Sequence, residues 1–154
     1  MFKRILVTLD GSPLSEQALE KAVQIAETSQ AELTLLRVVT PLLKSYRAGM
    51  AKISAIKTAE QQLVEMAETY LNGIADGIRE KGLAVNTVTI LGVPYKEIVD
   101  YIEKQDVDLL VMSTRGETGL TRWLLGSVTD HVVRGVFIPV LVVPAHGATE
   151  SDSE

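Results

Sequence analysis

Short apolar runs alternate along the chain with longer segments in which apolar residues recur every three or four positions. The short runs, rich in Val, Ile, Leu and Thr, predict five β-strands, at residues 4–9, 32–39, 84–91, 107–112 and 139–143. The longer segments predict helices at residues 13–29, 51–81 and 126–134, and a short helix that opens at Pro94. This alternating order is typical of a parallel sheet with right-handed crossovers and helices on both faces.

The predicted helices carry two further expectations. Ser12 and Pro13 fit the cap and the first turn of the helix that follows the first strand. In the long helix at residues 51–81, residues three or four apart form one apolar stripe. The stripe consists of Ile53, Ile56, Ala59, Leu63, Ala67, Tyr70, Ile74 and Ile78.

The length of 154 residues fits one domain, which we place at residues 1–144. Hydrophobic residues make up 46% of the chain but aromatic residues only 5%, so aliphatic side chains must fill the core. Such a core suits a parallel sheet covered on both faces. Residues 145–154 are small, polar and acidic, and we expect them to form a disordered tail.

Composition removes several classes of function. The sequence contains no cysteine, which excludes disulfides, cysteine zinc sites and cysteine nucleophiles and is compatible with the cytoplasmic location that we expect. The formal net charge of −5 and the absence of a basic cluster argue against nucleic acid as a partner. No apolar run approaches the ~20 residues of a membrane span, so we expect no membrane partner.

Candidate chemistry lies where the predicted first and fourth strands end, because open parallel sheets bind ligands beyond the carboxyl ends of their strands. The segment after the fourth strand contains Gly116, Gly119 and Gly126. Glycines let backbone N–H groups approach an anion closely, and the helix that starts at Gly126 favours phosphate through its dipole and unpaired amides. Ser127 and Thr129 add hydroxyl donors. The alternative is that these glycines only serve turns.

Two common phosphate motifs do not fit this segment. A Walker A loop requires a lysine directly after its last glycine, and no glycine here is followed by one. The Gly-x-Gly-x-x-Gly spacing of dinucleotide-binding proteins is also missing from the segment.

A different spacing does fit. Ser113, Gly116, Gly126 and Ser127 align with the loop Gly-x2-Gly-x9-Gly-Ser/Thr of nucleotide-binding universal stress proteins. The first strand with its Asp10, the Gly-Val-Pro at 92–94 and the Ile-Pro-Val-Leu-Val-Val-Pro at 138–144 also resemble that family. The resemblance implies an open five-stranded parallel sheet of order 3-2-1-4-5 with helices on both faces, of the adenine-nucleotide α-hydrolase type. It further implies ATP as ligand, accompanied by Mg²⁺ or Mn²⁺.

The resemblance also implies roles for individual residues. Thr8 and Asp10 would lie beside the nucleotide, Val38 would line the adenine pocket, and Met112 and Ser113 would approach adenine and ribose. The implied phosphate-binding residues are Gly116, Gly126, Ser127, Val128 and Thr129.

Ser113 departs from the family, which has glycine at this position. If the backbone there needs a positive φ, serine costs roughly 1–2 kcal/mol. If the position needs only a close approach, the small side chain fits and can donate a hydrogen bond.

The last apolar run, from Ile138 to Val143, lies at the sheet edge in the implied strand order. Members of the family commonly dimerise through this strand, and a bare apolar edge favours pairing with a second copy. We therefore expect a homodimer.

The resemblance thus implies an ATP-binding regulatory or stress-response module. We expect at most slow ATP hydrolysis, since Glu117 is the one carboxylate within the glycine loop. The principal alternative is a dimeric interaction protein that binds no nucleotide, for which Ser113 is the supporting feature. An enzyme on the same fold would need an acceptor site and a general base. A response-regulator receiver would need further acidic residues beside Asp10.

Overall fold

The computed structural model describes residues 1–42, 50–114 and 125–145, with the backbone alone described at residues 50 and 51. All strands and helices expected from the sequence are present in these ranges, with ends within two residues of their expected positions. They are β1 (Arg4–Thr8), α1 (Pro13–Ser29), β2 (Glu32–Val39), α2 (Met50–Arg79), β3 (Val85–Leu91), α3 (Pro94–Lys104), β4 (Leu109–Ser113), α4 (Ser127–Gly135) and β5 (Val140–Val143).

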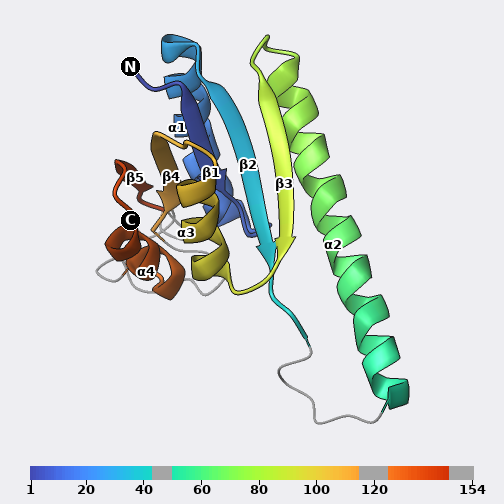
Figure 1. Cartoon of the computed structure of the whole chain (residues 1–154). Helices are drawn as coiled ribbons and strands as arrows, with labels where there is room; N and C mark the ends of the chain where they lie inside the picture. The colour runs from blue at the N-terminus through green and yellow to red at the C-terminus, as the bar shows by residue number, and fades with distance from the viewer. Residues whose placement is uncertain (43–49, 115–124, 146–154) are drawn as a thin grey trace, which may run out of the picture.

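The five strands form one sheet in the order β3-β2-β1-β4-β5, with every neighbouring pair parallel (Figure 1). The predicted order 3-2-1-4-5 is confirmed. β1 lies at the centre, where Val7 is in register with Leu35 of β2 and with Val111 of β4. From β1 the chain adds β2 and β3 on one side of the sheet and then β4 and β5 on the other. The order in which strands are added therefore reverses between β1 and β4. This reversal is the point at which such sheets bind ligands.

Successive side chains along each strand point to opposite faces of the sheet, and they form two separate apolar layers, one on each face. On one face, Val7, Leu35 and Val111 pack against α1 and α2, which contribute Ala22 and Leu71. On the other face, the layer joins the strands to α3 and α4 through Leu6, Leu36, Leu110, Met112, Ile98, Ile102 and Val132. Burying one such Leu or Val stabilises the fold by roughly 1.5–3 kcal/mol. The expectation of helices on both faces is confirmed.

The long helix α2 packs on the sheet only through its C-terminal half. Ala67, Leu71 and Ala75 are fully buried there, whereas Leu63 and Met66 are 37% and 66% exposed. In Figure 1 the N-terminal half continues past the carboxyl ends of the strands. The apolar stripe of this helix therefore continues beyond the part that the sheet covers.

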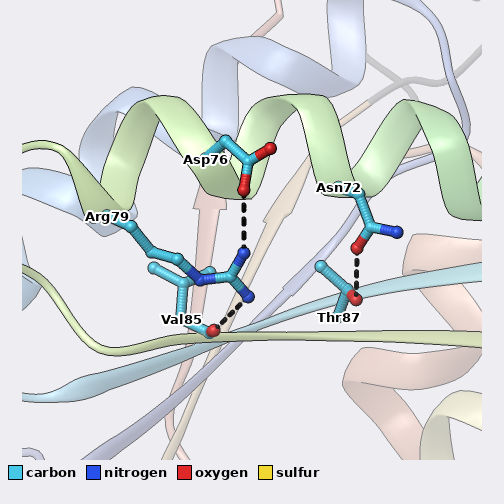
Figure 2. Close-up of polar contacts among 5 residues, drawn as sticks. All are labelled: Asn72, Asp76, Arg79, Val85 and Thr87. Atoms are coloured by element: carbon cyan, nitrogen blue, oxygen red, sulfur yellow. Dashed lines mark hydrogen bonds and ion pairs between the residues drawn. The ribbon is translucent and has the colours of Figure 1, made fainter.

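Polar contacts fix the C-terminal half of α2 to β3 (Figure 2). Arg79 Nη2 donates a hydrogen bond to the carbonyl oxygen of Val85 at 2.8 Å, and Arg79 Nη1 contacts Asp76 Oδ1 at 3.1 Å. Thr87 Oγ1 donates to Asn72 Oδ1 at 3.1 Å. Because α2 is anchored at this end, its other half is held out over the carboxyl edge of the sheet.

The end of the described chain shows where the expected tail begins. Ala145 is buried, and its N–H donates to Thr114 Oγ1 at 3.1 Å. Ala145 therefore packs with the domain, and residues 146–154 of the expected tail lie outside the described ranges. Among the helices described, none is long and apolar enough to span a bilayer.

Candidate functional site

A cavity of about 360 Å³ opens at the carboxyl ends of β1, β2 and β4. The starts of α1, α3 and α4 and one residue of α2 complete its wall. Nine of the ten residues selected from the sequence line it: Thr8, Asp10, Val38, Met112, Ser113, Gly126, Ser127, Val128 and Thr129. The tenth, Gly116, lies outside the described residues. The structure thus brings the described candidates to one place, while their roles as ligand contacts stay predictions.

Half of the lining was not anticipated from the sequence. These residues are Leu9, Ser15, Leu36, Arg37, Val39, Thr40, Leu63, Pro94 and Ile98. Pro94 directly follows Gly92 and Val93 of the family-like motif, and Ile98 follows one helical turn later, so that motif could have indicated both. Leu63 reaches the cavity only because α2 projects beyond the sheet, which no local pattern reveals.

One side of the cavity is apolar. Leu36 and Met112 come from the layer on the α3 and α4 face of the sheet, and Ile98 joins them from α3. Val38 packs against the same layer from β2. The arrangement offers a flat, aliphatic surface of the kind that accepts an aromatic ring.

The turn after β1 is held by short polar contacts. Asp10 Oδ1 accepts hydrogen bonds from the backbone N–H of Ser12 at 2.9 Å and from Ser12 Oγ at 2.5 Å. Ser12 Oγ in turn accepts from the N–H of Ser15 at 3.2 Å, which makes Ser12 the N-cap of α1 as predicted. Ser15 Oγ accepts from Asp10 N–H and donates to the Ser12 carbonyl oxygen. The Asp10 carboxylate is therefore partly committed to shaping its own turn.

The start of α4 also lines the cavity and supplies backbone amides to it. Gly126 N–H donates to the carbonyl oxygen of Thr114 at 2.7 Å, and the Gly126 carbonyl oxygen accepts the first intrahelical bond from Asp130. The amides of Ser127, Val128 and Thr129 consequently have no acceptor within the helix. No side chain caps this helix at Gly126. The first turn of α4 thus presents N–H groups and the positive end of the helix dipole beside the cavity.

Thr129 links α4 to β4 at the base of the site. Its Oγ1 donates to the carbonyl oxygen of Ser113 at 3.0 Å, and both residues are buried. The hydroxyl proton of Thr129 is therefore used within the fold, which leaves the amide as the group that Thr129 can offer to an anion.

Ser113 occupies the last position of β4 and carries no left-handed backbone strain. In the described part of the chain, positive φ angles occur at Gln30, Asp106, Gly11 and Gly82. Ser113 therefore does not incur the free-energy cost that serine would have in a left-handed backbone conformation.

Charge at the cavity comes from Asp10 and Arg37, which are the charged residues in the described lining. Nearby, burial raises the pKa of Tyr70 well above its ordinary value. The hydrogen bond from Tyr70 to Glu16 and the charge of Glu16 add to this, whereas Arg37 lowers the pKa. Within the described ranges there is no cluster of three or more Asp, Glu or His side chains that could hold a metal ion.

Comparisons with known proteins agree with this architecture. A model of the universal stress protein family matches residues 1–144. Universal stress protein MJ0531 of Methanocaldococcus jannaschii is 36% identical over 143 residues, which cover 93% of this chain and 82% of that protein.

Solved structures give the same result. The protein MJ0577 of Methanocaldococcus jannaschii matches with a TM-score of 0.79 at 30% identity, covering 96% of this chain and 99% of that one. A universal stress protein solved in complex with cAMP matches with a TM-score of 0.62 at 26% identity, covering 94% and 98%. On the extent of the family match and the identity to its members, this chain belongs to the universal stress protein family.

Proposed function

We propose that this chain binds an adenine nucleotide, ATP, in the cavity at the carboxyl edge of its sheet, and acts as a regulatory or stress-response module. The observation that carries the proposal is the pairing of two unlike walls in one cavity. Apolar residues that include Val38 and Met112 line the same cavity as the uncapped first turn of α4. A nucleotide has the matching halves, a flat base and a chain of phosphates.

In this binding mode the base packs on the aliphatic wall and the phosphates accept hydrogen bonds from the amides of Ser127, Val128 and Thr129. Thr8, the last residue of the central strand β1, and Asp10, in the turn that follows it, lie beside the ribose. Gly126, as the residue before α4, keeps side-chain bulk away from the phosphates. A relative solved in complex with cAMP supports an adenine nucleotide as the class of ligand.

Mg²⁺ or Mn²⁺ accompanies the triphosphate in our proposal. Both are hard cations that bind oxygen ligands, and with nucleotides they bind mainly through phosphate oxygens and water. Asp10 is the one carboxylate in the described lining. The protein's own donor set is therefore small, and the cation depends on the nucleotide for most of its ligands.

ATP hydrolysis in this site is slow at most. Catalysis of phosphoryl transfer to water needs a group that orients or activates the water. Asp10 Oδ1 already accepts two hydrogen bonds in its own turn, and Thr129 donates its proton to Ser113. Glu117 lies outside the described residues. The described side chains therefore support binding rather than rapid turnover.

We also propose a homodimer through β5 and a cytoplasmic location. β5 is an edge strand, so its outer hydrogen-bonding groups face away from the sheet. Phe137, three residues before β5, is fully exposed, and Leu141 on the strand is exposed as well. An apolar edge of this kind favours an isologous contact with a second copy.

The experiment that tests the proposed ligand is mass spectrometry of small molecules released by denaturing freshly purified protein, followed by calorimetric titration with ATP and Mg²⁺. Co-purified adenine nucleotide, or saturable binding of added ATP, supports the proposal. Folded protein that releases no nucleotide and gives no binding heat at about 100 µM would favour the alternative of a dimeric interaction protein.

A further inference from the structure

The guanidinium of Arg37 packs against two other parts of the molecule at the edge of the cavity. Arg37 lies in β2 directly before Val38, and its Cζ is 5.1 Å from the ring centroid of Tyr70 on α2. This is within the range of a cation–π contact. Arg37 is the cationic residue among the described ones that line the cavity.

The second contact is with the turn after β1. A Cβ placed on Gly11 would come 3.0 Å from Cζ, Nη1 and Nη2 of Arg37 alike. Three nearly equal distances show that the guanidinium lies flat over Gly11 rather than pointing at it. Gly11 also has a φ of +88°, which glycine adopts without strain. The turn can therefore keep its shape and its contact with Arg37 only because this position carries no side chain.

Tyr70 is itself fixed to the helix that follows the turn. Its hydroxyl donates to Glu16 Oε1 at 2.5 Å, and Glu16 lies in the first turn of α1. The contacts form a closed circuit, from Gly11 to Arg37 on β2, to Tyr70 on α2, to Glu16 on α1 and back along the chain to the turn. Asp10 lies directly before Gly11 and so adjoins this circuit.

We propose that Arg37 is a positioning residue, which holds residues 10–12 in the conformation that places Asp10 at the cavity. Its effect on ligand affinity rests on the proposed function, whereas its effect on the turn does not. The competing assignment is a direct contact between Arg37 and a phosphate group. The two differ in what they predict for a ligand without phosphate.

The test is Arg37→Met, which keeps the length of the side chain and removes the planar charged group. We expect the affinities for ATP and for adenosine to fall by a similar factor, roughly fivefold, as for loss of one cation–π contact. Arg4→Met serves as the control, because Arg4 pairs with Asp106 at the opposite end of the sheet. A loss for ATP alone would overturn the positioning role in favour of a phosphate contact, and no loss for either ligand would overturn it outright.

Hydrogen exchange in ligand-free protein provides a second readout. Arg37→Met and Tyr70→Leu should both speed exchange of the amides at residues 10–16 while leaving those of β4 unchanged, and the double variant should add little. Unchanged exchange at residues 10–16 in both variants would refute the positioning role. If the wild-type protein bound no nucleotide, the proposed function would fail, yet this measurement would still decide the role of Arg37.

Discussion

The hydroxyl of Thr129 donates a hydrogen bond to the carbonyl oxygen of Ser113 at 3.0 Å, and this bond joins the start of α4 to the end of β4. Both residues are buried, so water cannot replace the bond if it is lost. The contact sets where the first-turn amides of α4 lie relative to the sheet. The proposed phosphate site therefore depends on a residue that uses its hydroxyl inside the protein.

Thr129→Val should lower the free energy of unfolding by about 1–3 kcal/mol, because it removes the buried hydrogen bond from the Thr129 hydroxyl to the Ser113 carbonyl oxygen. Urea denaturation followed by circular dichroism measures this change. Thr129→Ser restores a hydroxyl at the same position and should recover most of the lost stability. A valine variant as stable as wild type would show that the bond contributes nothing.

Gly126→Val should weaken ATP binding by more than about tenfold, or ~1.4 kcal/mol, because a branched side chain would stand where the phosphates approach α4. The backbone at Gly126 has φ −57° and ψ 154°, which a valine adopts readily, so we expect the variant to fold. Calorimetric titration gives the affinity. Wild-type affinity in a folded variant would mean that the phosphates do not pass this residue.

Ser113→Gly should leave ATP affinity unchanged or raise it slightly, because this substitution restores the family residue at a position with ordinary strand backbone. We expect a modest loss of stability of about 0.5–1 kcal/mol, since glycine loses more conformational freedom on entering a strand. Paired titration and denaturation curves separate the two effects. A large loss of affinity would assign the serine hydroxyl a direct role in the site.

Leu141→Lys should convert the proposed dimer to a monomer, because a charge on the exposed side of β5 opposes pairing of two edges. Leu91→Lys is the matched control, since Leu91 is exposed on β3 at the other edge of the sheet. Light scattering coupled to size exclusion reports the mass of each variant. A wild-type monomer at tens of micromolar, or a control variant that also dissociates, would contradict a β5 interface.

The sequence predicts the fold well because a local sequence pattern identifies each helix and strand. The strand at 32–39 and the helix at 13–29 have the observed bounds, since apolar period and the Ser12 cap are properties of a few neighbouring residues. The extent of packing along α2 was not predictable in this way. Periodicity identifies an apolar face that includes Leu63 and Ala67, but only the length of the sheet decides that Ala67 is covered and Leu63 is not.

The candidate site likewise contains residues that the sequence predicted and residues that it did not. The family-like motifs lead directly to Asp10, Val38 and Gly126, because these positions lie at strand ends or at a helix start. No motif in the sequence indicated Arg37. Alternation along β2 places its side chain on the face opposite Val38, but its contacts with Gly11 and Tyr70 arise from segments far apart in the sequence.

The most direct test of the nucleotide site is a two-dimensional NMR titration of ¹⁵N-labelled protein with ATP and, separately, with adenosine. We predict that ATP shifts the amide resonances of Ser127, Val128 and Thr129 together with those of Val38 and Met112. Adenosine, which lacks phosphate, should shift the latter pair and leave the three α4 amides in place. ATP binding that leaves those three amides unchanged would contradict the account.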